Sequence, residues 1–375
     1  MASLYLHIPF CKTKCCYCDF NSFASVGDLY KPYLVAIKKE IDETLSEEKG
    51  ESLDTLFIGG GTPTVLSPAD LVGLISHVKG VVGFSPGIEI SIEANPGTVS
   101  ESDLALLREG GVNRISFGVQ SFIDSELRLL GRCHDAGEAE KAVWAARSAG
   151  FGNISLDLMY GVPCQAPHLW QRSLDMAISL APNHLSLYQL TVEQGTPLKG
   201  YIEIGRMVLP DEDEIAEMDL LTEQLCGAAG LNRYEISNYA ETGSECAHNV
   251  NYWLNREYYA AGAGSVSYLQ GVRMHRVADP VHYIDCISRD VSVIAGSEEL
   301  SREAAFRETV VMGLRMVRGV SCRELHDRYG IDPEEYYGPI LRRLTDLSLL
   351  QLSGGRLRIT GEGRHLANTI MAELV

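Results

Sequence analysis

The chain has 375 residues, of which 45% are hydrophobic, and a formal charge of −18 at pH 7. Such a chain can bury a large core over two or three domains, and none of its apolar runs reaches the roughly 18 residues that a membrane-spanning helix needs. The acidic excess argues against nucleic-acid binding, because affinity for phosphates comes largely from lysine and arginine. Ten cysteines without a recognisable secretion signal predict a cytoplasmic protein in a reducing environment.

Residues 1–208 alternate between short apolar runs and helical patterns. We expect strands at residues 4–10, 55–58, 88–92, 114–117, 154–158 and 184–190, and helices at residues 28–49, 67–79, 101–109, 135–149 and 168–179. Alternating units of this length build a parallel sheet with helices packed on it. The sequence therefore predicts an α/β fold with six parallel strands, either as an open doubly wound sheet or as a barrel.

The rest of the chain follows a different pattern. Residues 209–299 begin with a predicted helix at 211–229 and continue as a tyrosine-rich linking region. Residues 300–375 predict helices at 301–317, from 321 and at 333–347, then a hairpin at 349–359 and a last helix. This succession is similar to a winged-helix module, although its arginines are balanced by acidic residues, which makes DNA binding a poor interpretation. We expect three domains, at residues 1–208, 209–299 and 300–375.

Four cysteines fall within eight residues directly after the first predicted strand. Cys11, Cys15 and Cys18 have the spacing C-x3-C-x2-C, and three such thiolates can hold three irons of a cubane cluster, leaving the fourth iron open. A structural zinc site would need a fourth tetrahedral ligand, which Cys16, beside Cys15, is poorly placed to supply. Disulfide frameworks belong to small secreted domains. An iron-sulfur cluster is therefore the favoured interpretation, and Cys16 has no assigned role.

Polar residues and glycines gather where the predicted strands end. Gly-Gly-Gly-Thr-Pro at residues 59–63 follows the second strand, and Glu93, Gln120 and Asp157 lie at the ends of the next three. In βα folds the carboxyl ends of the strands form the ligand-binding edge. A glycine run lets backbone approach a ligand closely, although a tight turn, and ordinary ion pairs for the acids, are the alternatives. We expect one crevice that contains these residues and the cysteine loop.

The cysteine spacing at the end of the first strand, with an aromatic residue before the last cysteine, resembles the radical S-adenosylmethionine (radical SAM) enzymes. The resemblance implies a partial, six-stranded barrel of βα units. It also implies a 4Fe-4S cluster whose open iron binds the amino and carboxylate groups of S-adenosylmethionine. In that family an electron from the cluster cleaves the sulfonium and gives a 5′-deoxyadenosyl radical.

A closer resemblance covers nearly the whole chain. Residues 5–18, 59–64, 118–132 and 157–163, with Glu93 and the winged C-terminal module, are similar to the oxygen-independent coproporphyrinogen III oxidase group. By position, this resemblance implies contacts to S-adenosylmethionine from Tyr5, Tyr17, Gly60, Gly61, Thr62, Glu93, Gln120, Arg132 and Asp157.

Two departures separate the branches of that group. The decarboxylating oxidase has a further cysteine two residues after the last cluster cysteine, where this chain has Phe20. In addition, residues 248–253 match the His-Asn-x-x-Tyr-Trp motif of the heme chaperone branch. His248 is then a candidate axial ligand for heme iron, and Tyr252 and Trp253 offer flat apolar surface. The other candidate ligands are His275, His282 and Cys246.

The resemblance predicts a cytoplasmic heme chaperone that passes heme to hemoproteins, with the respiratory chain as the expected acceptor and a peripheral membrane contact during delivery. The alternative is an enzyme that decarboxylates coproporphyrinogen III. The sequence leaves open whether the chain catalyses a reaction, and it does not reveal the oligomeric state.

Overall fold

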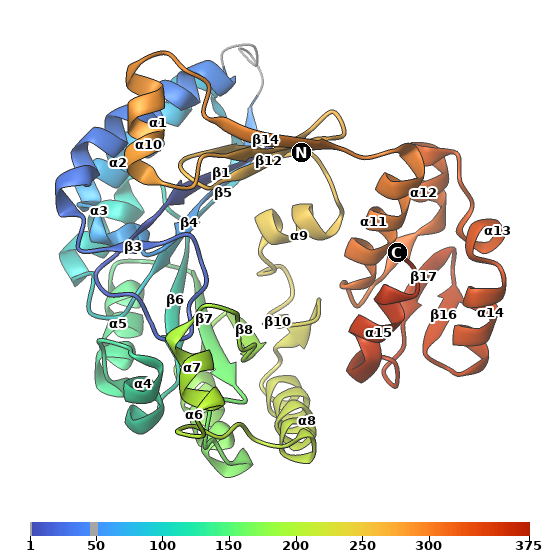
Figure 1. Cartoon of the computed structure of the whole chain (residues 1–375). Coiled ribbons are helices and arrows are strands. Elements are labelled where there is room, and N and C mark those ends of the chain that lie inside the picture. The colour runs from blue at the N-terminus through green and yellow to red at the C-terminus, as the bar shows by residue number, and fades with distance from the viewer. Residues whose placement is uncertain (1, 46–51) are drawn as a thin grey trace.

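The computed structural model describes residues 2–45 and 52–375 (Figure 1). Its centre is a nine-stranded sheet in the order β11-β1-β4-β5-β6-β7-β8-β10-β9. The strands from β11 to β8 run parallel, and β10 pairs antiparallel with both of its neighbours. The predicted α/β class is confirmed. The strands are β1 (Ser3–Ile8), β4 (Leu53–Gly60), β5 (Phe84–Ala94), β6 (Arg114–Gln120), β7 (Asn153–Tyr160), β8 (His184–Gln189), β9 (Asn232–Arg233), β10 (Asn238–Ala240) and β11 (Tyr259–Ala261).

Helices pack on the outer face of this sheet (Figure 1). Several begin at side-chain caps, as where Ser100 and Asp103 form a capping box that satisfies two free backbone N–H groups. The predicted helix at 28–49 begins as a 3-10 turn (Gly27–Leu29), and its predicted residues 46–49 lie outside the described residues. The helices are α1 (Tyr30–Leu45), α2 (Pro68–Val82), α3 (Glu101–Glu109), α4 (Asp124–Leu130), α5 (Ala136–Ser148), α6 (Pro167–Ser179) and α7 (Pro197–Glu203).

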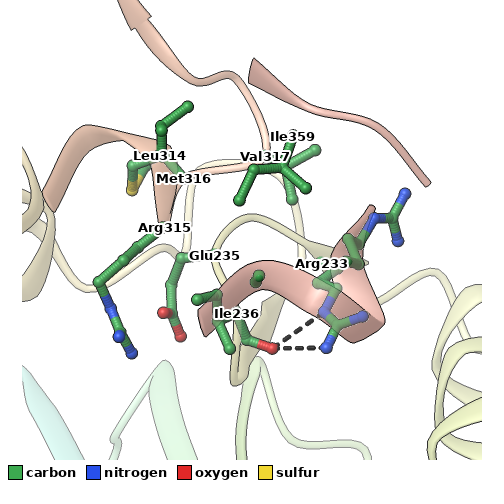
Figure 2. Close-up of a pocket in the computed structure, with 10 residues that line it drawn as sticks. Arg233, Glu235, Ile236, Leu314, Arg315, Met316, Val317 and Ile359 are labelled. Atoms are coloured by element: carbon green, nitrogen blue, oxygen red, sulfur yellow. Dashed lines mark hydrogen bonds between the residues drawn. The ribbon is translucent and has the colours of Figure 1, made fainter. Parts of the chain in front are cut away.

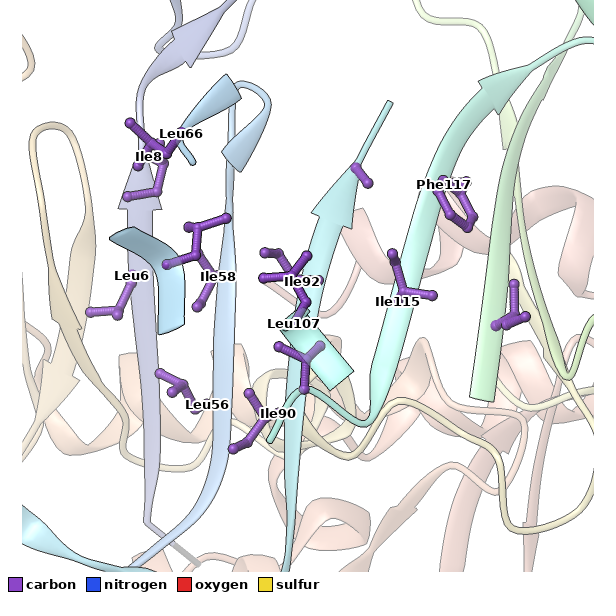
Figure 3. Close-up of a cluster of buried hydrophobic side chains, with 14 of the residues drawn as sticks. Leu6, Ile8, Leu56, Ile58, Leu66, Ile90, Ile92, Leu107, Ile115 and Phe117 are labelled. Carbon is purple, nitrogen blue, oxygen red and sulfur yellow. The ribbon is translucent and has the colours of Figure 1, made fainter. Parts of the chain in front are cut away.

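The two faces of the sheet differ because side chains alternate along each strand. Ile58 and Ile92 point into the apolar core shared with the helices (Figure 3). Phe57, Glu93 and Asp157 point to the opposite face. The polar residues that the sequence predicts at strand ends therefore lie inside the curved sheet, away from the main core.

The structure corrects the strands predicted around the main sheet in two ways. It adds β11, β10 and β9, which are only two or three residues long and have no apolar run to reveal them. It also divides the predicted strand at 4–10. The chain leaves the sheet after β1, and β2 (Phe10–Cys11) pairs with β3 (Phe23–Ala24) instead. Pro9 separates the two strands, because it has no N–H to continue the ladder.

The linking region adds β11 to one edge of the main sheet and β10 and β9 to the other, and it carries a small sheet of its own. Helix α8 (Glu212–Ala228) packs on α6, and α9 (Ala247–Trp253) contacts β4. The strands β12 (Val266–Leu269), β13 (Val272–Arg276) and β14 (Ile294–Glu299) form a three-stranded antiparallel sheet, and α10 (Pro280–Ser288) packs on α1.

The C-terminal module has a separate core around Phe306 and Leu357. The predicted helix at 333–347 is broken at Gly338, which has a φ of 38° and is followed by Pro339. The predicted hairpin is confirmed as β16 and β17. The elements are α11 (Arg302–Leu314), β15 (Val320–Ser321), α12 (Cys322–Tyr329), α13 (Pro333–Tyr337), α14 (Pro339–Asp346), β16 (Leu350–Ser353), β17 (Arg356–Ile359) and α15 (Ala367–Ala372).

A small cavity of about 30 Å³ marks the junction between this module and the linking region (Figure 2). Arg233 donates to the carbonyl of Ile236 there, and Glu235 forms an isolated antiparallel bridge with Met316. Across residues 2–45 and 52–375, no helix has both the length and the apolar character needed to cross a membrane.

Candidate functional site

A cavity of about 330 Å³ opens at the carboxyl ends of the parallel strands. It brings together the cysteine loop after β2 and the ends of β4, β5, β6, β7 and β8, which are separate in the sequence. All of the predicted site residues except Tyr5 and His248 line it: Cys11, Cys15, Tyr17, Cys18, Gly60, Gly61, Thr62, Glu93, Gln120, Arg132 and Asp157.

The cysteine loop is fixed by its backbone and by Cys16. The N–H of Cys16 donates to the carbonyl of Leu130 at 3.2 Å, and its thiol donates to the carbonyl of Leu129 at 3.2 Å. The carbonyl of Cys16 accepts the N–H of Leu198 at 2.9 Å. Cys16 therefore ties the loop to α4 and α7. It is a structural anchor, which the sequence does not reveal.

The donor set fits an iron-sulfur cluster. Cys11, Cys15 and Cys18 are free thiols on one wall of the cavity. Within the described ranges, no three His, Cys, Asp or Glu side chains converge on a single ion position. A cubane cluster does not require such convergence, because each cysteine binds a different iron. The loop is therefore compatible with a cluster and unlike a closed zinc site.

The glycine segment packs directly against the cysteine loop. A Cβ at Gly61 would lie 2.6 Å from the carbonyl oxygen of Phe10 and 2.9 Å from the sulfur of Cys11, so only glycine fits. Gly60 has a φ of 122°, which also favours glycine. The N–H of Thr62 donates to the Phe10 carbonyl at 2.7 Å, and its hydroxyl donates to the Cys11 sulfur at 3.5 Å. These contacts join the end of β4 to the start of the cysteine loop.

Arg132 lies between the cysteine loop and the ends of β5 and β6. Its guanidinium donates to the Cys15 sulfur at 3.3 Å, to Asn95 Oδ1 at 2.5 Å and to the carbonyl of Gly118. Its buried Nε has no hydrogen-bond partner among the described residues. This arrangement places a permanent positive charge at the wall of the cavity, where a carboxylate or a thiolate can be neutralised.

Two partly buried carboxyl groups face the cavity from β5 and β7. Glu93 accepts the N–H of Gly60 at 3.0 Å, and Asp157 accepts the hydroxyl of Ser116 at 3.0 Å. Burial raises the pKa of Glu93 to about 7, and the nearby Asp157 charge adds to this effect, while the Gly60 N–H and Arg114 oppose it. Burial also raises the pKa of Asp157. Both groups can accept hydrogen bonds from hydroxyl groups of a ligand.

Replacing Glu93 with glutamine is expected to stabilise the protein at pH 8. Below the usual pKa of 4.5 the carboxyl is protonated in folded and unfolded chains, so it does not affect stability. As pH rises from 4.5 through about 7, the unfolded chain ionises first and the folded chain loses stability. With cavity water solvating the carboxylate, the stabilisation by glutamine should be about 2 kcal/mol at pH 8.

Thermal denaturation of Glu93→Gln at several pH values between 5 and 8 checks this expectation. Glu109→Gln, which removes an exposed carboxyl on α3, is the matched control and should not change the pH dependence. A Glu93→Gln protein that is no more stable than the wild type at pH 8 would contradict the assigned burial cost.

Comparisons with known proteins agree with this geometry. The profile of the Radical SAM superfamily matches residues 5–177, and that of the HemN C-terminal domain matches residues 300–366. The chain is 37% identical over 371 residues to the heme chaperone HemW of Bacillus subtilis, covering 99% of this chain and 98% of that protein. The chain belongs to the HemW family. The predicted radical SAM and coproporphyrinogen oxidase-like relationship is thereby confirmed.

The chain is also similar to a second HemW protein and to one solved structure. It is 41% identical over 264 residues to HemW of Escherichia coli, covering 70% of this chain and 69% of that protein. Coproporphyrinogen III oxidase (HemN) from Escherichia coli, described as a radical SAM enzyme, has a TM-score of 0.86 and 23% identity, covering 100% of this chain and 89% of that one. This likeness establishes the fold alone.

His248 and Tyr5 stand apart from the residues that line the cavity. The imidazole of His248 is fully buried, with Nδ1 bonded to Thr55 Oγ1 at 2.8 Å and Nε2 bonded to the Tyr252 hydroxyl at 2.9 Å. Burial and the Arg114 charge lower the pKa of His248 to about 3, so the ring is neutral. The Tyr5 hydroxyl bonds to His7 Nδ1 at 2.9 Å. Neither side chain reaches the cavity in this conformation.

The other named residues of the His-Asn-x-x-Tyr-Trp motif are partly buried, and contacts within the protein hold the helix that carries them. Glu89 accepts the N–H groups of Ala247 at 2.9 Å and His248 at 3.1 Å, so β5 caps the start of α9. Trp253 lies under the guanidinium of Arg315 at 4.4 Å. Among the other heme-ligand candidates, Cys246 is buried, and His275 and His282 are exposed away from the cavity.

Several residues that line the cavity are absent from the predicted set. Asn95 lies two residues after Glu93 and forms hydrogen bonds with both Arg132 and Thr62. Its position at a strand end could have predicted that it lines the cavity. Met159 and Tyr188 are on β7 and β8 and could have been found from the alternation that places Asp157 inside. Phe20 and Glu193 lie on loops, for which the sequence offers no such signal.

Proposed function

We propose that this chain is a heme chaperone that binds heme and transfers it to acceptor hemoproteins. The observation that carries the proposal is the near full-length similarity to HemW of Bacillus subtilis, at 37% identity over 98% of that protein. The cavity with three free cysteines on one wall supports a 4Fe-4S cluster on Cys11, Cys15 and Cys18, with S-adenosylmethionine on the open iron.

The side chains around the cavity can position these groups. The cluster would supply one-electron chemistry next to the sulfonium of S-adenosylmethionine. Arg132 would neutralise the methionyl carboxylate, and the backbone of residues 60–62 would hold the amino group. Glu93 and Asp157 would accept hydrogen bonds from ribose hydroxyls, and Tyr17 and Gln120 would border the adenosyl group. Tyr5 does not line the cavity, so it would contact S-adenosylmethionine only after its side chain moves.

We further propose that heme delivery occurs in the cytoplasm, with respiratory-chain hemoproteins as acceptors and a peripheral contact with the membrane. This part of the proposal rests on the family resemblance. His248 remains the proposed iron ligand, on the condition that its Nε2 leaves the Tyr252 hydroxyl.

A second candidate function is the radical decarboxylation of coproporphyrinogen III. It rests on the resemblance of the sequence to the oxidase group, since the fold shared with HemN does not decide the activity. Against it stands Phe20, which occupies the place of the oxidase's additional cysteine. Anaerobic protein reconstituted with iron and sulfide should bind hemin in a spectroscopic titration and should not convert coproporphyrinogen III when reductant and S-adenosylmethionine are supplied. Turnover without hemin binding would favour the oxidase.

Adjacent cysteines provide a controlled test of the cluster. We expect Cys15→Ser to lose the iron and sulfide bound on reconstitution, because it removes one of three ligands. Cys16→Ser should keep both, since a serine hydroxyl can still donate to the Leu129 carbonyl. Iron and sulfide analysis with absorption spectra checks the pair. Full cluster content in Cys15→Ser would remove Cys15 from the ligand set.

A further inference from the structure

Part of the cavity wall contains residues that the proposal does not assign to the cluster or to S-adenosylmethionine. This part runs from the loop after Cys18 to the ends of β7 and β8, and includes Phe20, Met159, Tyr188 and Glu193. The proposed cofactor residues that line the cavity lie on the cysteine loop and on the ends of β4, β5 and β6, apart from Asp157 on β7 and Arg132 after α4. The cavity therefore has a region that is available to another molecule.

Two aromatic rings are exposed in this region. The side chain of Phe20 is 65% exposed and that of Tyr188 is 42% exposed. Among the large exposed hydrophobic side chains in residues 2–45 and 52–375, these are the two that line the cavity. Aromatic rings left in water at the mouth of a cavity indicate a contact surface for a ligand, because their burial on binding is favourable.

The two rings come from opposite flanks of the opening. Phe20 follows the cysteine loop, which leaves the sheet at β1, whereas Tyr188 lies on β8. In the sheet order, β4, β5, β6 and β7 stand between β1 and β8. A ligand that enters between the flanks thus passes an aromatic side chain on each.

Both rings are held on fixed backbone. Lys14 Nζ donates to the carbonyls of Phe20 at 3.1 Å and Ser22 at 3.3 Å. Next to Phe20, Asn21 Nδ2 donates to the carbonyls of Ala263 and Ala278, at 3.0 Å each. Tyr188 is paired with Met159 in the parallel ladder of β8 and β7. A fixed backbone limits the positions that each ring can take, which reduces the entropy lost when a flat molecule packs on it.

We propose that Phe20 and Tyr188 bind the flat face of heme at the cavity mouth. This inference rests on the proposed heme-binding function, but it gives the porphyrin a site other than His248, because the buried imidazole beside Thr55 does not line this cavity. A porphyrin is broad, planar and apolar, so offset packing on aromatic rings is favourable. Its two carboxylates would turn toward Lys14, which is exposed beside Phe20, and away from the acidic groups of Asp19 and Glu193 on the rim.

Hemin titration of anaerobically reconstituted variants tests the inference. Phe20→Ala and Tyr188→Ala should each weaken hemin binding about tenfold, and Phe20→Tyr, which keeps a ring, should bind nearly as tightly as the wild type. Trp144→Ala is the matched control, since Trp144 is 57% exposed on α5 and does not line the cavity. Its affinity should equal that of the wild type.

The outcomes separate this inference from the proposed function. If the wild type does not bind hemin, the chaperone proposal fails and the inference fails with it. If the wild type binds hemin but Phe20→Ala and Tyr188→Ala bind as tightly as Trp144→Ala, only the inference is overturned. Tyr188 lies on a strand away from the cysteine loop, so its variant decides the matter even if Phe20→Ala changes cluster content.

Discussion

Glu40→Gln is expected to lower the free energy of unfolding by about 3–5 kcal/mol, because it leaves a buried arginine without its charge partner. Glu40 Oε1 accepts Arg276 Nε at 2.5 Å, and Oε2 accepts the Tyr283 hydroxyl at 2.5 Å and the Gly262 N–H at 2.7 Å. Glu40 is 3% exposed and Arg276 is 5% exposed, so solvent cannot replace the lost bonds. This group ties the linking region to α1.

Denaturation of Glu40→Gln beside Glu109→Gln measures this effect. Glu109 is an exposed acid on α3, and its replacement should change stability by less than about 0.5 kcal/mol. Changing Glu40 and Arg276 together to leucine should recover only the part of the loss that comes from the uncompensated charge, because the Tyr283 hydroxyl and the Gly262 N–H still lose their acceptor. Equal stability of the two glutamine variants would show that the buried pair does not hold the linking region in place.

Short-range patterns predicted the part of the fold that local sequence determines. The parallel strands β1, β4, β5, β6, β7 and β8 have apolar runs that made them predictable. The alternation of side chains along a strand predicts which residues near its end face the cavity. Glu40 shows the limit of this reasoning. It lies among the polar positions of an amphipathic helix, and its partner Arg276 is 236 residues away. No local pattern could reveal that the two meet in a buried site.

The same limit explains which site residues were predicted. The cysteine spacing and the strand-end residues 60–62, Glu93 and Asp157 meet at one edge because parallel strands end together. His248 was predicted from a sequence motif alone, because it does not lie at the carboxyl end of a parallel strand. The chain returns through α9 to a position beside Thr55, near the start of β4, so the imidazole lies away from the carboxyl ends that form the cavity.

His248→Ala is expected to destabilise the heme-free protein by about 2–5 kcal/mol, because it creates a cavity and removes the partner of the buried Thr55 hydroxyl and of the partly buried Tyr252 hydroxyl. Thr55→Val, which removes one of these hydrogen bonds and keeps the imidazole, should cost about 1–2 kcal/mol. Denaturation without heme measures both. Wild-type stability in His248→Ala would show that the buried hydrogen bonds contribute little.

A changed Soret band in His248→Ala would therefore not establish iron ligation, since the variant also disturbs the interior of the sheet. Tyr252→Phe is the sharper test. It removes the hydroxyl that occupies Nε2, so it should tighten hemin binding if the iron takes this nitrogen. Unchanged binding in Tyr252→Phe, together with weaker binding in Phe20→Ala, would place the porphyrin at the cavity mouth. His248 would then act as a structural residue that holds α9 against β4.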